Sequence, residues 1–219
     1  MKLCKICGKQ TISYRHPRFD MVFHECQYCG FIFKDEANYV SLREEIKKYD
    51  EHHNEDDNMG YVNFLTDFIE AAVLPYIQTG KALDFGSGPN PVLSKIMRNS
   101  YGFDVDIYDL YYAKEKVYKN QVYDLITSTE VVEHLKSPMD TFILFYKHLK
   151  PGGILSIMTL FHPRNKEMLF DWFYIRDKTH VSFYTVQTMR IIAEKFNFEF
   201  IETNDYRYTV FRKKAVLMI

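Results

Sequence analysis

The chain of 219 residues has no long apolar run, and this absence argues against a membrane-spanning helix. Its longest apolar stretch, residues 154–161, is interrupted by Ser156 and Thr159, whereas a transmembrane helix needs roughly 20 apolar residues. We expect this stretch to be a buried strand. The opening residues, MKLCK, lack the apolar segment and cleavage site of a secretory signal. The sequence therefore predicts a soluble, cytoplasmic protein without a membrane partner.

An excess of charge of either sign is also missing. Lys and Arg number 28 and Asp and Glu number 29, which gives a net charge of −1. No overall basic field is present to attract RNA or anionic lipid. With 47% hydrophobic residues, the chain is long enough to bury one substantial core and to carry a small appendage.

Cysteine is scarce and confined to the first thirty residues. Cys4, Cys7, Cys26 and Cys29 form two C-x2-C pairs separated by 18 residues, and a glycine follows each pair. This spacing is typical of a zinc ribbon, in which four thiolates fill the tetrahedron around a structural Zn²⁺. Two disulfides and four unpaired thiols are the alternatives. A reducing cytosol disfavours the first, and the clustering disfavours the second.

Charge changes sign along the first 58 residues. Residues 1–34 carry six basic and two acidic residues, a local charge of +4, and residues 35–58 carry nine acidic and three basic residues. We predict a zinc ribbon over residues 1–34, a partly helical linker over 35–58 and a main domain over 59–219. The +4 charge alone indicates RNA only weakly, because small modules often carry lysines for solubility.

An apolar run at residues 81–85 leads into a glycine turn and then into apolar residues at helical spacing. Strand, glycine turn and helix form the layout of a nucleotide-binding crossover. Pro91 occupies the third glycine position of the dinucleotide motif, which disfavours NAD. Asp84, two residues before Gly86, would repel a pyrophosphate and attract a cationic ligand.

In this motif, LDFGSGP at residues 83–89, the sequence resembles class I S-adenosylmethionine-dependent methyltransferases. The similarity continues at residues 123–135 and 149–155, in the same order and spacing. It implies an α/β fold with a Rossmann-like, seven-stranded, mostly parallel sheet and helices on both faces. Residues 198–203 and 208–216 would form its terminal antiparallel pair.

The resemblance implies S-adenosylmethionine as the cofactor, with the glycine turn facing its methionine end. An acid at the end of the next strand would hold the ribose. Asp109, 21 residues after Gly88, is favoured over Asp106 for this role. The expected cofactor-binding residues are Asp84, Gly86, Ser87, Gly88, Asp109, Thr129 and Glu130. No third strand with polar adenine contacts is evident between residues 111 and 121.

Histidines that follow these motifs are the candidate catalytic residues: His134, His162 and His180. Residues 171–184, DWFYIRDKTHVSFY, resemble a block of one methyltransferase subgroup. We expect His180 to act as general base or to position the acceptor, with Asp177 orienting its ring. Simple packing of this block stays an equally weighted alternative.

Glu130, Glu133 and His134 stand at i, i+3 and i+4, so a helix would place them on one face. In some quinone O-methyltransferases of this fold, the same motif binds a divalent metal. The motif also occurs without metal, and a structural role is favoured here.

Three functions follow from these observations. The favoured one is a methyltransferase that acts on a small metabolite, for example a sugar nucleotide or a polyketide-like molecule. The second is an RNA methyltransferase that uses the zinc ribbon to hold its substrate. The third is a non-catalytic adaptor that keeps the cofactor fold as a scaffold.

Overall fold

The central sheet is built from short apolar runs that are buried on both faces, as parallel strands require. In the computed structural model, which describes residues 2–51 and 58–215, six strands pair in the order β5-β4-β6-β7-β10-β9. They are β4 (Lys81–Phe85), β5 (Asp104–Tyr108), β6 (Tyr123–Thr129), β7 (Leu149–Met158), β9 (Phe198–Thr203) and β10 (Tyr208–Lys213). The first four are parallel, and β10 runs antiparallel to β7 and β9. The predicted Rossmann-like, mostly parallel sheet is confirmed.

The predicted number of strands is wrong, because this sheet has six strands among the described residues and not seven. The missing strand would lie between β5 and β6 in the sequence, where residues 110–122 form turns and bends. This segment carries the charged run KEK at residues 114–116 and lacks an alternating apolar pattern. Asp109 turns the chain, because its Oδ1 accepts hydrogen bonds from the backbone N–H groups of Tyr111 and Tyr112.

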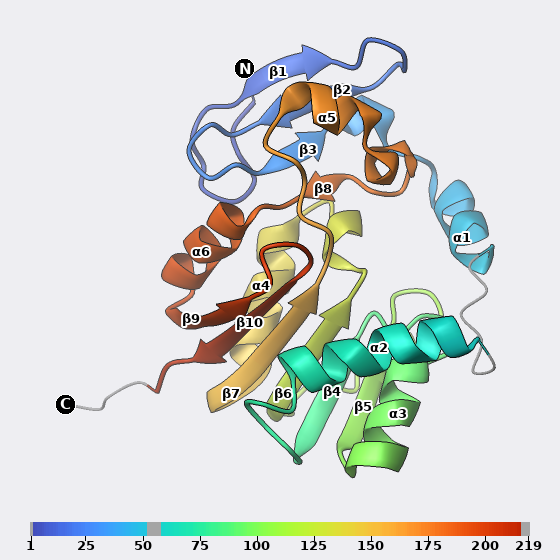
Figure 1. Ribbon diagram of the computed structural model, residues 1–219, viewed down its shortest axis with the longest axis vertical. Helices are drawn as coiled ribbons and strands as arrows, with labels where there is room; N and C mark the ends of the chain where they lie inside the picture. Colours follow the sequence, from blue (N-terminus) through green and yellow to red (C-terminus); the bar gives the residue numbers. More distant parts are fainter. Residues whose placement is uncertain (1, 52–57, 216–219) are drawn as a thin grey trace.

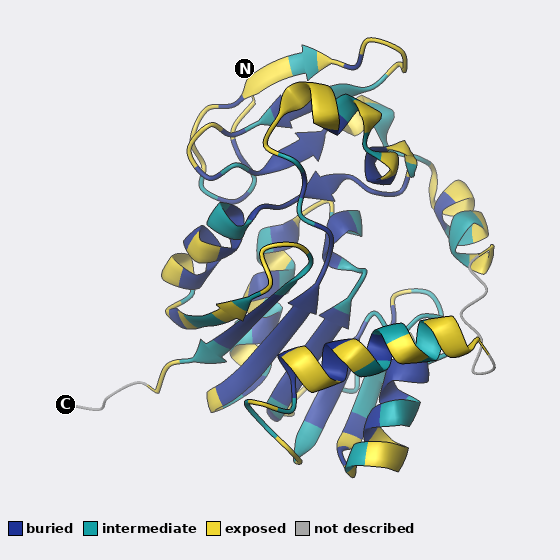
Figure 2. Cartoon of the chain, in the orientation of Figure 1, coloured by how far each residue is buried: buried dark blue, intermediate teal, exposed yellow. Residues whose placement is uncertain are grey.

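Helices cover both faces of the sheet (Figure 1). They are α2 (Met59–Ala72), α3 (Val92–Tyr101), α4 (Pro138–His148) and α6 (Val186–Lys195). Phe68 of α2 and Met97 of α3 belong to the core on one face, and Phe145 of α4 and Ile192 of α6 belong to the core on the other. Figure 2 shows the central strands largely buried and the outer surfaces of the helices exposed.

The N-terminal residues form a second, smaller sheet, drawn in blue at the top of Figure 1. Its strands β1 (Ile12–Arg15), β2 (Val22–Glu25) and β3 (Ile32–Lys34) are antiparallel. A fourth strand, β8 (Ser182–Phe183), comes from the main part of the chain and pairs with β3. Phe31 of this N-terminal ribbon (residues 1–34) also packs in one core with Tyr184 and Met189. The packing therefore crosses the predicted boundary at residue 34.

Five short elements complete the described part of the chain. They are η1 (Glu36–Asn38), α1 (Leu42–Asp50), η2 (Val132–His134), α5 (Lys166–Asp171) and η3 (Phe173–Arg176). Ser41 and Glu44 form a capping box that starts α1. Residues 52–57 of the predicted linker lie outside the described residues. No helix in the described part of the chain has the length and apolarity to cross a membrane.

Candidate functional site

A cavity of about 1110 Å³ opens at the carboxyl ends of β4, β5 and β6. One wall, the strand side, consists of residues at or just after these ends: Asp84 to Gly88, Tyr108, Asp109, Thr129 and Glu130. The opposite wall, the loop side, consists of α1 and residues 173–180. Ligands of open α/β sheets bind at this edge. The fold thus places the predicted cofactor residues and most of the predicted catalytic residues around one space.

The glycine turn on the strand side holds two glycines with left-handed backbone, Gly86 at φ +86° and Gly88 at φ +68°. The backbone N–H groups of Gly86 and Ser87 donate to the Tyr108 carbonyl at 2.7 and 3.2 Å. A Cβ on Gly86 would lie 2.2 Å from Cγ2 of Val131, whereas a Cβ on Gly88 would meet nothing within 4 Å. Gly86 is therefore required by packing, and Gly88 leaves room in the cavity.

Three buried polar atoms of cavity-lining residues have no hydrogen-bond partner among the described residues. They are the Ser87 hydroxyl oxygen, Oε1 of Glu130 and Oε2 of Glu133. A buried polar group without a partner costs about 1–3 kcal/mol, so such groups are normally satisfied by water or ligand. The Ser87 hydroxyl and Oε1 of Glu130 therefore offer contacts to a molecule bound on the strand side.

On the strand side, one acid lies near the end of β4 and another lies just after β5. Asp84 is 1% exposed and accepts a hydrogen bond from the Ser94 hydroxyl at 2.7 Å. Burial raises the pKa of Asp84 to about 6. Asp109 accepts a hydrogen bond from the backbone N–H of Gly88 at 3.0 Å, which ties the glycine turn to the end of β5. Asp106, the alternative to Asp109, accepts from the Tyr123 hydroxyl instead and does not line the cavity.

Two further carboxyl groups face each other across one tyrosine. The Tyr174 hydroxyl lies 3.1 Å from Oε2 of Glu130 and also contacts Oε1 of Glu133. Burial raises the pKa of both glutamates, and the neighbouring charge of Glu130 raises that of Glu133 further. This environment favours the protonated acid at Glu133.

His134 and His180 meet beside this pair, with ring centroids 4.7 Å apart. Nδ1 of His180 lies 2.9 Å from the Tyr174 carbonyl, and Nδ1 of His134 lies 3.2 Å from the Thr179 carbonyl. A carbonyl oxygen can only accept, so Nδ1 carries the hydrogen in each neutral ring. Burial, followed by the His134 charge, lowers the pKa of His180 to about 3. His180 is therefore neutral, with its lone pair on Nε2.

Donor atoms of Glu133, His134 and His180 all lie within 4.8 Å of one another, so these residues could relay a proton or hold a metal ion. The possible metal ligands in the sequence are a different set, because they include Glu130 and would have to lie on one face of a helix. Glu130 has a left-handed backbone, φ +53°, and lies outside the single turn of η2. In the structure, His180 is the third residue of the cluster in place of Glu130.

Asp177 is near His180 but does not orient its ring, contrary to the sequence-based expectation. Oδ1 of Asp177 accepts hydrogen bonds from the backbone N–H of Thr179 at 2.8 Å and from its hydroxyl at 2.5 Å. The carbonyl of Tyr174 is the group that fixes the imidazole. Asp177 therefore shapes the turn that carries His180.

His162 is not part of the cavity. Its ring nitrogens lie 2.9 Å from the Pro163 carbonyl and 2.6 Å from the Gly30 carbonyl, so the ring packs against the N-terminal ribbon. Burial lowers its pKa. Because the ring faces another part of the chain, this geometry removes His162 from the candidate catalytic residues.

Tyr174 and α1 are site components that the sequence did not single out. The ring of Tyr49 in α1 packs against those of Tyr111 and His134, with ring centroids 5.6 and 5.1 Å apart, respectively. Tyr49 therefore forms part of the loop-side wall of the cavity. The aromatic content of residues 171–184 was a sign of Tyr174, but it did not distinguish this residue from its neighbours. Only the fold brings Tyr49 to the cavity.

The four cysteines converge in the N-terminal ribbon. Sγ of Cys4 lies 3.5 Å from that of Cys29, and Sγ of Cys7 lies 3.4 Å from that of Cys26. All four sulfur atoms lie within 4.8 Å of one another. Tetrahedral zinc with Zn–S bonds of about 2.3 Å separates sulfur atoms by about 3.8 Å. The donor set and its spacing therefore fit one structural Zn²⁺.

Comparison with known proteins gives a family match over most of the chain. Residues 52–203 match the family model described as a methyltransferase domain. A search of curated proteins found no significant match.

Solved structures share the fold at low sequence identity. A chain from the complex between the Haloferax volcanii Trm112 methyltransferase activator and a methyltransferase has a TM-score of 0.58 at 13% identity, with 80% of this chain and 100% of that chain covered. A Methanococcus maripaludis protein described as an S-adenosyl-L-methionine-dependent methyltransferase has a TM-score of 0.52 at 20% identity, covering 79% and 94%. Haemonchus contortus phosphoethanolamine N-methyltransferase 2, in complex with S-adenosyl-L-methionine, has a TM-score of 0.52 at 15% identity, covering 84% and 62%.

Proposed function

Because the chain belongs to the methyltransferase-domain family, we propose that it is an enzyme that transfers the methyl group of S-adenosylmethionine to a protonated nucleophile on a small molecule. The expected resemblance to class I methyltransferases is confirmed by the family match and by the Rossmann-like fold. Methyl transfer, the acceptor and the residue roles below are the proposal.

Residues of the strand side fit the cofactor. We assign its methionine end to Asp84 and the glycine turn, its ribose to Asp109, and further contacts to Thr129 and Glu130. The Ser87 hydroxyl and Oε1 of Glu130 supply buried polar atoms that a ligand would satisfy. When bound, S-adenosylmethionine supplies an electron-poor methyl group on a positively charged sulfur.

The charge of the cavity also supports this cofactor over a dinucleotide. Three acids line the cavity and have pKa values that burial raises: Asp84, Glu130 and Glu133. An ionised carboxylate attracts a nearby positive charge, which in turn lowers the pKa of the carboxyl group. The same carboxylate would repel a pyrophosphate. Asp84, whose pKa of about 6 leaves it ionised at neutral pH, therefore favours a cationic ligand, and a bound cation would also favour ionisation of the two glutamates.

His180 is the observation that carries the proposed chemistry. Its Nδ1 is committed to the Tyr174 carbonyl, so Nε2 is left as the unprotonated nitrogen of a neutral ring. We propose that Nε2 accepts the proton of the acceptor as that group attacks the methyl carbon, because bond formation to this carbon makes the proton acidic enough to transfer to an imidazole of low pKa. Positioning by the loop side and exclusion of water would supply much of the remaining acceleration.

Contacts of the ribbon favour a small acceptor over RNA. Four of the six basic side chains in residues 1–34 contact acceptor groups within the chain: Lys5, Arg15, Arg18 and Lys34. RNA affinity depends on the number of phosphates that Lys and Arg neutralise. Lys34 is buried and Lys5 is half-buried, so their charges are not free for phosphate. The exposed Arg15 and Arg18 are already paired with Asp20 and Asp171.

We propose that the ribbon binds one structural zinc through Cys4, Cys7, Cys26 and Cys29. With four thiolates, the metal has no open position for water or substrate. Its contribution would be to fix the fold of the ribbon, which lies against the loop side of the cavity.

The test uses methyl-labelled S-adenosylmethionine with two substrate pools, a small-molecule extract and purified total RNA. We expect label in the small-molecule pool with wild-type protein and with His148→Ala, a control histidine outside the cavity. Label in RNA would establish the second function, an RNA methyltransferase. No transfer, together with no binding of S-adenosylhomocysteine, would leave the non-catalytic adaptor.

A further inference from the structure

The edge of the zinc ribbon is joined to the segment that carries His180. β3 and β8 pair in antiparallel register, with Ile32 opposite Phe183 and Phe33 opposite Ser182. The backbone N–H of Lys34 donates to the carbonyl of Val181 at 3.0 Å. The ribbon sheet therefore ends one residue away from His180.

Lys34 reaches further along the same segment with its side chain. The residue is only 1% exposed, and Nζ donates to the backbone carbonyl of Asp177 at 2.7 Å. Burial lowers the pKa of Lys34 to about 8, and the Asp177 carboxylate opposes this effect. A lysine is almost never fully buried unless its ammonium group is bonded and its charge is compensated. The Asp177 turn provides both conditions.

The Asp177 carbonyl also accepts the backbone hydrogen bond that closes the turn leading to His180. The backbone N–H of His180 donates to the same Asp177 oxygen at 3.3 Å. On its other side the segment is held by η2, because the N–H of Val181 donates to the Glu133 carbonyl at 2.8 Å. Lys34 is thus the ribbon's side-chain contact with a turn that places His180 beside Glu133.

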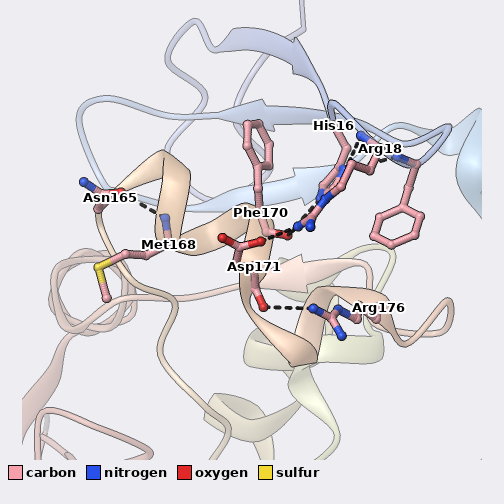
Figure 3. A network of polar contacts seen from close by, with 8 residues as sticks. His16, Arg18, Asn165, Met168, Phe170, Asp171 and Arg176 are labelled. Atoms are coloured by element: carbon pink, nitrogen blue, oxygen red, sulfur yellow. Dashed lines mark hydrogen bonds and ion pairs between the residues drawn. The ribbon is translucent and has the colours of Figure 1, made fainter.

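A second contact holds the segment before the turn (Figure 3). Nε2 of His16 lies 3.0 Å from the Phe170 carbonyl, and Arg18 contacts both this carbonyl and the Asp171 carboxylate. Arg176 of η3 donates to the Asp171 carbonyl at 3.2 Å. Between these two contacts lies Tyr174, whose carbonyl fixes the His180 ring.

We propose that Lys34 is a positioning residue for His180, and that through it the zinc ribbon holds the loop side of the cavity while the strand side is independent of the ribbon. This proposal rests on the proposed function only for the importance of His180 in chemistry. The positioning itself can be measured without turnover.

The test compares Lys34→Met with Lys9→Met in the full chain bound to S-adenosylhomocysteine. Methionine keeps the length of Lys34 and removes its charge and its hydrogen bond, while the Asp177 carbonyl still accepts from the His180 N–H. Lys9 is an exposed ribbon lysine whose Nζ lies over the Tyr28 ring. Zinc content and S-adenosylhomocysteine affinity should match wild type within about twofold in both variants, because neither substitution touches the strand side.

Hydrogen exchange and histidine NMR then report on the turn. In Lys34→Met, the amides of Thr179, His180 and Val181 should exchange about tenfold faster or more, the effect of losing one hydrogen bond to a charged group. The ¹⁵N spectrum of the His180 ring should change from one Nδ1–H tautomer to a mixture of tautomers. Lys9→Met should leave both signals unchanged. Wild-type exchange and a single tautomer in Lys34→Met would overturn the proposal.

Zinc removal tests the same inference without a variant. After chelation of the wild-type protein, the amides of residues 179–181 should lose protection while those of Gly86 and Ser87 on the strand side keep it. No loss at residues 179–181, or an equal loss at both places, would overturn the proposal. If His180→Ala leaves turnover unchanged, the proposed base is wrong, but these exchange results still decide whether Lys34 positions the turn.

Discussion

Substitution of the two glycines in the strand-side turn separates stability from ligand binding. Gly86 and Gly88 both have left-handed backbone, with φ of +86° and +68°. They differ in what a Cβ would meet. On Gly86 it would lie 2.2 and 3.0 Å from the two methyl carbons of Val131, and on Gly88 it would meet nothing within 4 Å.

The expected costs follow from these two differences. An L residue in the left-handed region costs roughly 1–2 kcal/mol, and this applies to alanine at either position. Overpacking adds about 1–3 kcal/mol at Gly86 only, since Val131 must move. We therefore expect Gly86→Ala to lower the free energy of unfolding by about 2–5 kcal/mol and Gly88→Ala by about 1–2 kcal/mol.

Urea unfolding and titration with S-adenosylhomocysteine measure the two effects separately. Gly88→Ala should be the more stable variant and still bind weakly, because its methyl group projects into the space that we assign to the cofactor. Binding by Gly86→Ala should be closer to wild type at temperatures where that variant is folded. Equal destabilisation by both changes would refute the packing argument, and wild-type affinity in Gly88→Ala would refute the placement of the ligand.

Three further predictions concern the loop side and the ribbon. His180→Ala should lower turnover about 100-fold and leave S-adenosylhomocysteine affinity near wild type, measured by calorimetry beside initial rates; unchanged turnover would make His180 structural. Burial raises the pKa of Glu133, so the folded protein holds this proton at pH values where the unfolded chain has lost it. The free energy of unfolding therefore falls as the pH rises from the pKa of Glu133 in the unfolded chain toward its pKa in the folded protein. Denaturant unfolding at pH 5 and pH 8 should then show Glu133→Gln gaining on wild type, by up to about 1.4 kcal/mol per pH unit; a constant difference would contradict the raised pKa. Wild-type protein should contain one zinc per chain by elemental analysis and Cys26→Ser should lose it, whereas wild type purified without chelator but free of metal would exclude the zinc site.

Local motifs made much of the strand side predictable from sequence. Asp84 and the glycine turn occur within five residues, and a strand, glycine turn and helix in this order are typical of a nucleotide-binding crossover. Asp109 was placed by its distance along the chain, and the structure brings it to the turn through the Gly88 N–H. The cysteine spacing similarly anticipated a cluster whose sulfur atoms lie within 4.8 Å.

Contacts between distant segments were not predictable in this way. Lys34 and Asp177 are 143 positions apart, and Glu133 and Tyr174 are 41 apart. Their meeting depends on the pairing of β3 with β8, and β8 is too short to be recognised from periodicity. His162 was a reasonable catalytic candidate by order in the chain, but its ring faces the ribbon.

The strand count shows a different limit. A seventh strand was inferred from the resemblance, although residues 110–122 carry no alternating apolar run. The structure follows the local residues and leaves β5 at the edge of the sheet. Family patterns and local physical chemistry disagreed at this segment, and the local residues were the better guide.

The most direct test of the account is a calorimetric titration of the purified protein with S-adenosylmethionine and, separately, with NAD. The cavity combines the acids Asp84, Glu130 and Glu133 with a glycine turn that has proline at the third glycine position. We therefore predict a saturable one-to-one binding heat and thermal stabilisation with S-adenosylmethionine, and neither with NAD. Tight binding of NAD, with no heat and no stabilisation from S-adenosylmethionine, would contradict the central claim.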